Sequence, residues 1–377
     1  MKNKIYLVSF EYFPISQGGL ARHAKALIDR LLRYEVYKAI IATPKNNKIK
    51  LQKDIIAIPC TYVDNKYLCY LEFSWKLYFL FKKKFKKDKF LFFSSFSYLF
   101  NPFLPKSFYI FVHSNQKRVY FTKYDEESMK EMLLRKFTYY FNYHWEVYLC
   151  RKAKKIFSVS PSVKEDTYQQ YDIDKSKIII VTNGLDTELF KKKLPRKYHK
   201  KNLLFVGKLF PRKNIVYLIN IFKLLIDKDS EFNLHIMGNG HFKYINKLKL
   251  IINTLKLSNK IFIHRYISDY ALNKLYEKSD LFVFTSLVEG LPLVLLEAMS
   301  KGLPILAYNV IGVRDVVINK KSGFLIKVGD IENFVKKILF FYKNKRAYQE
   351  FSENALRRLN DFSWDKSVII LHESLKK

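Results

Sequence analysis

Cysteine and long apolar runs are scarce in this chain of 377 residues. Its cysteines are too few and too scattered for a disulfide framework or a zinc site, and they stand at Cys60, Cys69 and Cys150. A reducing cytoplasm is the simplest setting for such a chain. No run approaches the roughly 18 to 20 uninterrupted apolar residues of a membrane-spanning helix. The first residues, MKNKIYLVSF, lead directly into an expected strand, so we expect no signal peptide.

Acidic residues are also in short supply, since 34 of them face 68 lysines and arginines and leave a net charge of +34. Such a charge suits nucleic acid, an anionic membrane surface or an anionic substrate. It also fits a compositional bias of the coding DNA, because the chain is rich in Lys, Asn, Ile, Phe and Tyr. No helix-turn-helix, zinc finger or aromatic RNA motif is present, so we expect no specific nucleic-acid partner. A basic nucleic-acid-binding protein stays open as an alternative.

Strand and helix patterns alternate along the chain, which predicts an α/β protein with parallel sheets covered by helices. The length suits two domains. A charged, proline-containing stretch at 186–201 suits a linker between two doubly wound halves. We expect strands at residues 4–10, 37–43, 107–113, 155–160 and 177–184 in the first half, and at 202–209, 235–240, 260–266, 280–286 and 303–309 in the second.

The segment VEGLPLVLLEAMSKGLPI holds two glutamates, Glu289 and Glu297, in an E-x7-E spacing. Pro292 suits the first turn of a helix and Gly302 the position past its end, which predicts a helix over 293–300. Glu297 lies on that helix among apolar residues, where a buried carboxylate needs donors such as sugar or ribose hydroxyls. A solvated acidic residue is the alternative interpretation.

The separation of the two glutamates argues against a glycosidase. Eight helical residues span about 12 Å at 1.5 Å each. Paired glycosidase carboxylates lie roughly 5 to 9.5 Å apart. Glu289 and Glu297 are therefore expected to make separate ligand contacts.

Glycine-containing turns follow several expected strands. Gly18 and Gly19 come after the first strand and open a helix, where free N–H groups suit a diphosphate or the acceptor. The segment VGKLFPRKN follows the first strand of the second half and brings cations to a glycine turn. Its candidate residues are Gly207, Lys208, Arg212 and Lys213. MGNG, with Gly238, ends the next strand. A plain turn is the alternative for each of these glycines.

These segments, in this order, resemble the retaining glycosyltransferases of family 4 (glycosyl transferases group 1), which have the GT-B fold. The resemblance implies two doubly wound Rossmann-like domains that face each other across a cleft. The acceptor-binding domain would comprise residues 1–186 with a C-terminal helix at about 362–377, and the donor-binding domain residues 187–361. The implied reaction moves a sugar from a nucleotide-diphosphate sugar to an acceptor hydroxyl with retention, without a metal or cofactor. Bacterial surface polysaccharide or glycan assembly is the implied setting.

The resemblance also assigns roles to individual residues. Glu297 would hold the ribose, and Glu289 the hydroxyls of the donor sugar. Lys208 and Lys213 would hold the diphosphate, with support from Arg212. His113, at a strand end, would position the donor sugar, which places Glu289, His113, Lys208 and Lys213 in the catalytic set. The other donor-binding positions are Gly18, Gly19, Gly207, Gly238, Tyr266, Leu293 and Val294. The chain departs from the family pattern at Lys208, Asn214, Arg265 and Ile311.

The stretch from Lys76 to Phe93 is basic and aromatic, with seven lysines and one aspartate between Lys76 and Lys89. It suits an anionic membrane surface at about 1 kcal/mol per cation. It thereby favours a lipid-linked or glycan acceptor and a protein peripheral at the inner face of the plasma membrane. A solvated helix with core aromatics is the alternative. Two aspartate pairs, at 172 and 174 and at 227 and 229, are expected to be solvated turns and no metal site.

Three other functions stay open. A sugar phosphorylase or a nucleotide-sugar epimerase would use the same fold. A degenerate transferase that acts as a partner protein is the third, although the presence of both Glu289 and Glu297 weighs against it.

Overall fold

The chain folds as two compact units in the computed structural model. The first comprises residues 1–121, 132–183 and 364–377, and the second residues 122–131 and 184–363. The structure describes residues 4–15, 18–45, 50–61, 66–84, 88–98, 104–114, 117, 122, 129–185, 190, 201–265 and 268–376, without the side chains of 66, 67, 82–84 and 131. The stretch expected to link the domains, 186–201, lies largely outside these residues.

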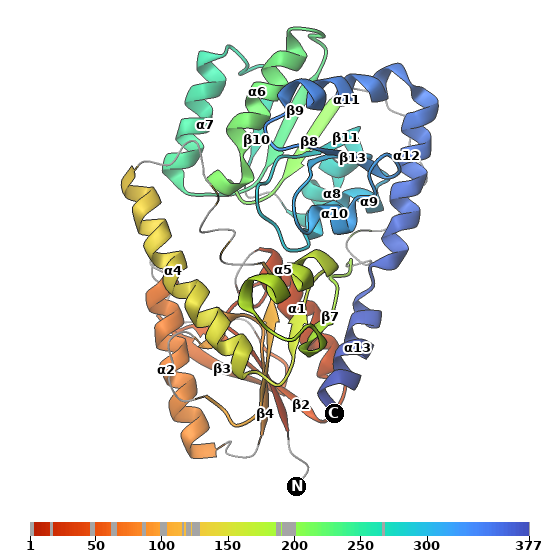
Figure 1. Cartoon of the computed structure of the whole chain (residues 1–377). Helices are drawn as coiled ribbons and strands as arrows, with labels where there is room; N and C mark the ends of the chain where they lie inside the picture. Colours follow the sequence, from red (N-terminus) through yellow and green to blue (C-terminus); the bar gives the residue numbers. More distant parts are fainter. Residues whose placement is uncertain are drawn as a thin grey trace. The chain divides into compact units, whose positions relative to one another are not determined.

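The first unit is built on a seven-stranded parallel sheet in the order β3-β2-β1-β4-β5-β6-β7. Figure 1 shows helices of this unit beside the sheet, among them α2 and α4. Its strands are short, β-branched or aromatic runs, and the inner ones are buried on both faces, as parallel strands under helices must be. They are β1 (Ile5–Ser9), β2 (Tyr37–Pro44), β3 (Ile55–Cys60), β4 (Lys89–Phe92), β5 (Phe108–Val112), β6 (Ile156–Ser158) and β7 (Ile178–Ile180).

Helices cover the first sheet. They are α1 (Gly19–Leu31), α2 (Lys66–Lys84), α4 (Met129–Lys152), α5 (Pro161–Tyr171) and α13 (Trp364–Lys376), with the short 3-10 turns η1 (Ser95–Tyr98) and η2 (Lys175–Lys177). The last helix, α13, packs against α1, near the other end of the chain, within this unit. Two polar contacts join α13 to the beginning of the fold. Asp365 pairs with Arg30 of α1 at 3.1 Å, and His372 shares a 2.8 Å hydrogen bond with Tyr37 of β2.

The second unit has a six-stranded parallel sheet in the order β10-β9-β8-β11-β12-β13. Its strands are β8 (Asn202–Val206), β9 (Asn233–Met237), β10 (Ile261–His264), β11 (Leu281–Phe284), β12 (Ile305–Tyr308) and β13 (Gly323–Ile326). The helices are α6 (Ile215–Ile226), α7 (Phe242–Thr254), α8 (Asp269–Lys278), α9 (Leu293–Ser300), α10 (Val313–Val316), α11 (Ile331–Lys343) and α12 (Lys345–Arg358), with turns η3 (Pro211–Lys213) and η4 (Leu359–Asp361).

The expected fold class, two doubly wound α/β sheets, is confirmed, and so is the helix at 293–300, which is α9. Three strands were missed. The run that forms β4 lies inside the basic aromatic stretch, β3 contains a proline, and β13 begins with a glycine. Pro292 was expected in the first turn of this helix. It lies just before the helix instead, with an extended ψ of 116°, and Leu293 is the first helical residue.

Each sheet has a point at which its strand order reverses, and such points place ligands at the carboxyl ends of the strands. In the first sheet the reversal lies between β1 and β4, and in the second between β8 and β11. The segments that leave these strands therefore frame the candidate site in each unit.

Candidate functional site

A buried ion pair between Lys213 and Glu289 occupies the reversal point of the second sheet. Lys213 closes the η3 turn that follows β8, and Glu289 lies in the loop between β11 and α9. The Nζ of Lys213 donates to Oε1 of Glu289, and both side chains are buried. The Ser286 hydroxyl donates to the same oxygen at 2.5 Å. Segments that are 76 residues apart in the sequence thus meet in one charged cluster.

The environment of this pair shifts both pKa values. Burial lowers the pKa of Lys213 to about 8, against the opposing attraction of Glu289, and Arg212 and Lys208 lower it further by repulsion. Burial alone would raise the pKa of Glu289, but Lys213, Arg212 and the bond from Ser286 outweigh it and hold that pKa below its usual value. At pH 7 the pair is therefore an ammonium beside a carboxylate.

Hydrogen bonds join the two loops that carry the pair. Arg212 donates from Nη1 to the carbonyl of Val288 at 2.8 Å and lies 3.9 Å from the Glu289 carboxylate. The Thr285 hydroxyl donates to the carbonyl of Lys213 at 3.0 Å, so β11 supports the turn after β8. Arg212, expected to support the diphosphate site, thus also holds the loop of Glu289 in place.

Glu297 is buried on α9, as its apolar neighbours predicted. Its Oε2 accepts a 2.8 Å hydrogen bond from the hydroxyl of Tyr276, on α8. Leu293 and Val294, the two half-buried residues that begin α9, complete the expected donor-binding positions on this helix. Sequence analysis missed Tyr276, because a tyrosine at helical spacing from Leu272 is indistinguishable from an ordinary core residue.

The glycine turns of the second unit are required by the fold itself. A Cβ at Gly238 would lie 1.8 Å from the carbonyl oxygen of Gly207, so the turns after β8 and β9 touch through bare backbone. The plain-turn interpretation of Gly238 therefore has a physical basis, independent of any ligand. Asn214, where the family has glycine, has left-handed backbone (φ 55°), and asparagine is among the residues that tolerate it. Arg265, which also departs from the family pattern, donates at 3.2 Å to the side chain of Asn239 in the turn after β9.

In the first unit His113 lies beside a second histidine, His23. His113 follows β5 and donates from Nε2 to the carbonyl of Phe93 at 2.7 Å. Burial lowers the pKa of His113 to about 4, against the effect of that bond. His23, on α1, lies with its ring 4.6 Å from that of His113 and shares a 2.8 Å hydrogen bond with Asn183. Burial, and then His113, hold the pKa of His23 well below its usual value, so both rings are neutral at pH 7.

Gly18 and Gly19 lie at the start of α1. Gly18 precedes the helix with φ 127°, a conformation that favours glycine, and Gly19 is the first helical residue. A Cβ at Gly19 would meet nothing within 4 Å, which leaves open space beside the backbone there. His23, which sequence analysis did not single out, is four residues further along this helix.

Other predicted positions fall elsewhere. Tyr266 lies outside the residues that the structure describes. Of the aspartates, Asp172, Asp174 and Asp227 are exposed, as expected of solvated turns, whereas Asp229 is half-buried and pairs with Lys201 at 2.7 Å. The described residues contain no group of three or more His, Cys, Asp or Glu side chains arranged to hold a metal ion. None of the described helices is long and apolar enough to cross a bilayer.

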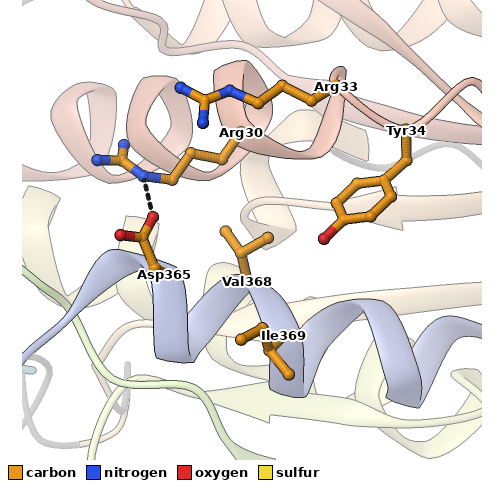
Figure 2. Close-up of a pocket in the computed structure, with 6 residues that line it drawn as sticks. All are labelled: Arg30, Arg33, Tyr34, Asp365, Val368 and Ile369. Atoms are coloured by element: carbon orange, nitrogen blue, oxygen red, sulfur yellow. Dashed lines mark hydrogen bonds and ion pairs between the residues drawn. The ribbon is translucent and has the colours of Figure 1, made fainter.

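A small pocket of about 210 Å³ lies between α1 and α13 in the first unit (Figure 2). Arg33 and Tyr34 line it, and Arg30 points across it to the carboxylate of Asp365. None of the residues expected to bind the donor lines this pocket. It is therefore a feature of the packing between the two helices and separate from the candidate site.

Comparison with known proteins decides what these two units are. The family model described as "Glycosyltransferase Family 4" matches residues 17–189, and that described as "Glycosyl transferases group 1" matches residues 186–358. Together the two models match residues 17–358, so the chain belongs to the glycosyltransferases that they describe. An "Uncharacterized glycosyltransferase" of Haemophilus influenzae is 33% identical over 205 residues, which cover 54% of this chain and 56% of that protein.

A second relative of this glycosyl transferase is the Escherichia coli protein named "UDP-Gal:alpha-D-GlcNAc-diphosphoundecaprenol alpha-1,3-galactosyltransferase". It is 30% identical over 213 residues, or 52% of this chain and 54% of that protein. The matched segments thus span about half the length of these two curated relatives.

Solved structures confirm the GT-B fold of this glycosyl transferase. A sucrose-phosphate synthase from Thermosynechococcus elongatus superposes with a TM-score of 0.79 at 17% identity, over 100% of this chain and 98% of that one. WaaG, "a glycosyltransferase involved in lipopolysaccharide biosynthesis", superposes with a TM-score of 0.73 at 16% identity, over 97% and 99% of the two chains. At such identities the likeness concerns the fold alone.

Proposed function

We propose that this chain transfers a sugar from a nucleotide-diphosphate sugar to an acceptor hydroxyl with retention of anomeric configuration. Its setting would be the assembly of bacterial surface polysaccharide or a related glycan. The family membership supports the reaction class. The name of the Escherichia coli relative, with its UDP-Gal donor and diphosphoundecaprenol-linked acceptor, makes UDP-sugars the first donors to test and a lipid-linked glycan the first acceptor.

The observation that carries the proposal is the buried cluster of Lys213, Glu289 and Ser286 at the reversal point of the second sheet. A cation held there before substrate arrives can stabilise charge as it develops on a departing diphosphate, without reorganising at that moment. Lys208 would add a second positive charge to the diphosphate. Because cationic side chains can do this work, the proposed reaction uses no metal or cofactor.

Each carboxylate has its own part in the proposed site. Glu297, oriented by Tyr276, would accept hydrogen bonds from the ribose hydroxyls. Glu289, which takes its present hydrogen bonds from Lys213 and Ser286, would also accept from hydroxyls of the donor sugar. A carboxylate has lone pairs for about four hydrogen bonds, so ligand hydroxyls can add to the partners already present.

The proposed chemistry is a front-face displacement. The acceptor oxygen forms a bond to the anomeric carbon as the bond from that carbon to the diphosphate oxygen breaks. The acceptor proton passes to the departing phosphate, and the products are the glycoside and the nucleoside diphosphate. His113 would position the donor sugar, because a neutral imidazole with a pKa of about 4 is a weak base at pH 7.

We also propose that the first unit binds the acceptor and acts at the inner face of the cytoplasmic membrane. The basic stretch from Lys76 to Phe93 supports this, although Lys76 itself pairs with Glu72 at 2.6 Å on α2. Residues 82–87 of this stretch, which carry five of its lysines, lie wholly or in their side chains outside the described part of the structure. Two exposed aromatic residues on α2, Trp75 and Phe79, support this part of the proposal.

The thermal stability of the protein in a panel of nucleotide sugars and free nucleotides tests the donor site. A ligand at 100 times its dissociation constant stabilises by about 2.7 kcal/mol. We expect one nucleotide class to stabilise the native chain and to do so less for Glu297→Ala. Glu353→Ala, which removes a carboxylate that pairs with Arg357 on α12, is the matched control and should respond as the native chain does.

The outcomes of this experiment separate the alternatives. Stabilisation by no nucleotide would contradict the donor site. Stabilisation that Glu297→Ala does not weaken would remove Glu297 from it. Turnover that requires inorganic phosphate in place of an acceptor alcohol would identify a phosphorylase of the same fold.

A further inference from the structure

The long helix α4, which belongs to the first unit from Met132 onward, exposes a row of apolar and aromatic side chains, with the exposed His144 between the last two of them. They are Leu133, Leu134, Phe137, Tyr140, Phe141 and Tyr148, and we call this set the α4 outer face. The spacing of three, four and seven residues places them along one side of a helix. From Leu133 to Tyr148 the row is about 23 Å long at 1.5 Å per residue.

Before its last three turns, α4 contributes only half-buried side chains, such as Met132 and Tyr139, to the packing. Among its described side chains up to residue 141, none is buried, and the first buried one is Asn142. Only the later turns of the helix pack inward, with Val147, Leu149 and Cys150. A helix whose first half has no buried face gains little stability from its own unit, so its apolar side chains are available to something outside it.

A second helix of the same unit has a similar exposed side. On α2 the exposed Leu68, Trp75 and Phe79 follow one another at seven and four residues, which is again one face of a helix. Both helices connect to the short turn η1. Trp145 of α4 donates to the carbonyl of Tyr98 at 3.1 Å, and the ring of Phe81 of α2 lies 5.9 Å from that of Tyr98.

The charge of α4 identifies the kind of partner. Five cations stand in its sequence against two glutamates, and they are Lys130, Arg135, Lys136, Arg151 and Lys152. One of the glutamates, Glu146, is buried and accepts hydrogen bonds from Ser95 and Tyr171. Leucine, phenylalanine and tyrosine interleaved with lysine and arginine are typical of helices that lie in the headgroup region of an anionic bilayer.

We infer that the α4 outer face is a docking surface for an anionic lipid bilayer. The apolar side chains would enter the boundary between headgroups and acyl chains, while Lys130, Lys136, Arg151 and Lys152 meet the phosphates of the headgroups. The net charge of +34 would draw the chain to such a surface from a distance. The inference rests on the proposed action at a membrane and extends it. It assigns the apolar contact with the bilayer to α4 and not to the stretch from Lys76 to Phe93.

Flotation of the full chain with lipid vesicles tests the inference and needs no nucleotide or acceptor. Its result is therefore independent of whether the proposed transferase reaction is correct. Vesicles of pure phosphatidylcholine are compared with vesicles that contain phosphatidylglycerol. We expect binding to the second kind alone at 0.1 M salt, and weaker binding at 1 M, where screening shortens the reach of charge from about 10 to about 3 Å.

The double variant Leu134→Ser/Phe137→Ser removes the centre of the α4 outer face. We expect it to bind the anionic vesicles more than about tenfold less tightly, because each buried Leu or Phe is worth more than that factor. The matched control is Leu250→Ser/Phe242→Ser on α7 of the second unit. All four side chains are 66% exposed, so neither variant should unfold and only the first should lose vesicle binding.

Several results would overturn the inference. Vesicle binding that survives in the α4 variant, or that falls equally in both variants, would remove α4 as the docking surface. Failure of the native chain to bind anionic vesicles would remove the bilayer as its partner. A native chain that is dimeric in solution, with the α4 variant monomeric, would show that the face joins two copies of the chain.

Discussion

The two units use glycine turns that look alike in the sequence and differ in the structure. In the second unit a Cβ added at Gly238 would lie only 1.8 Å from the carbonyl oxygen of Gly207. In the first unit a Cβ at Gly19 would meet nothing within 4 Å. The first kind of glycine lets two loops of the protein touch. The second leaves backbone open to a ligand, which is the part that the family resemblance implies for it.

The polar groups near the two reversal points differ as well. The second unit has an ammonium and a carboxylate, Lys213 and Glu289, in a buried pair. The first has two neutral imidazoles, His23 and His113, among aromatic rings. A charged site suits a diphosphate, whereas a neutral one suits the hydroxyl groups of a sugar. The contrast agrees with the proposed division into a donor-binding and an acceptor-binding unit.

Separating the charged pair should have the largest effect. Lys213→Met and Glu289→Gln each leave one buried charged group without its partner, which typically lowers the free energy of unfolding by about 3 to 5 kcal/mol. The double variant should be more stable than either single one, because it leaves no buried charge. Turnover of the donor should fall at least about a hundredfold in all three, because Lys213→Met removes a cation that would stabilise the leaving group, and Glu289→Gln removes the carboxylate that holds this cation and would bind the donor sugar.

Urea unfolding and a nucleotide-release assay measure the two quantities. Asp227→Asn, which breaks the exposed pair of Lys223 and Asp227, is the control and should change stability by less than about 1 kcal/mol. Single variants as stable as the native chain would show that the pair is not held as the structure describes.

Acid should weaken the first unit through its histidines. The pKa of His113 is about 4 in the folded chain and about 6.5 when unfolded, so between these values only the unfolded state binds the proton. The free energy of unfolding should therefore be unaffected by this group above pH 6.5. It should fall by about 3 kcal/mol as the pH drops to about 4.

The variant His113→Phe removes this group and its repulsion of a charge on the neighbouring His23. Its stability should fall less steeply than that of the native chain between pH 6.5 and 4.5, as measured by urea unfolding at several pH values. His235 of the second unit, whose pKa burial also lowers to about 4, remains in both proteins and cancels in the difference. Equal slopes for the two proteins would contradict a neutral, buried His113.

The two glycines should respond in opposite ways to alanine. Gly238→Ala forces a Cβ against a carbonyl oxygen and should destabilise by about 1 to 3 kcal/mol. Gly19→Ala should leave stability unchanged or raise it by up to about 1 kcal/mol, since it restricts the unfolded chain. Thermal unfolding checks both. If Gly19 borders a ligand, its variant should lose turnover while it keeps its stability, and unchanged turnover would remove Gly19 from the site.

The smallest effect is expected at Tyr276. Tyr276→Phe removes the hydrogen bond that orients Glu297, and the KM for the donor should rise about three- to tenfold, with kcat little changed. Tyr348→Phe is the matched control, because the Tyr348 hydroxyl is also buried and donates at 2.8 Å to the carbonyl of Asp280. The two variants should lose similar stability, and a shift of KM in both or in neither would contradict a positioning role for Tyr276.

Much of the fold could be predicted because it depends on local patterns. The short apolar runs of β1, β5 and β8 and the proline and glycine around α9 act over a few residues, and the structure has these elements where they were expected. The strands β3, β4 and β13 could not be predicted in this way. A proline stands in β3, lysine-rich sequence precedes β4, and β13 begins with a glycine, so none of them has the uniform apolar run of β1, β5 or β8.

The candidate site was predictable only in part. The E-x7-E spacing and the turn after β8 drew attention to Glu289, Glu297 and Lys213, but a sequence without tertiary contacts cannot show which of them meet. Tyr276 and His23 carried no signal, because an aromatic residue or a histidine on a helix is most often part of the core.

The sequence by itself determined the alternation of strands and helices, the division into two α/β halves and the segments in which polar residues follow strands. Hydrophobic period and turn chemistry are local, and local rules suffice for them. Tertiary structure alone decided that Lys213 pairs with Glu289, that Tyr276 holds Glu297 and that Gly238 rests against Gly207. The first and last of these contacts form because neighbouring parallel strands bring their carboxyl ends to one edge of the sheet, and the second forms because two helices of the same unit pack together.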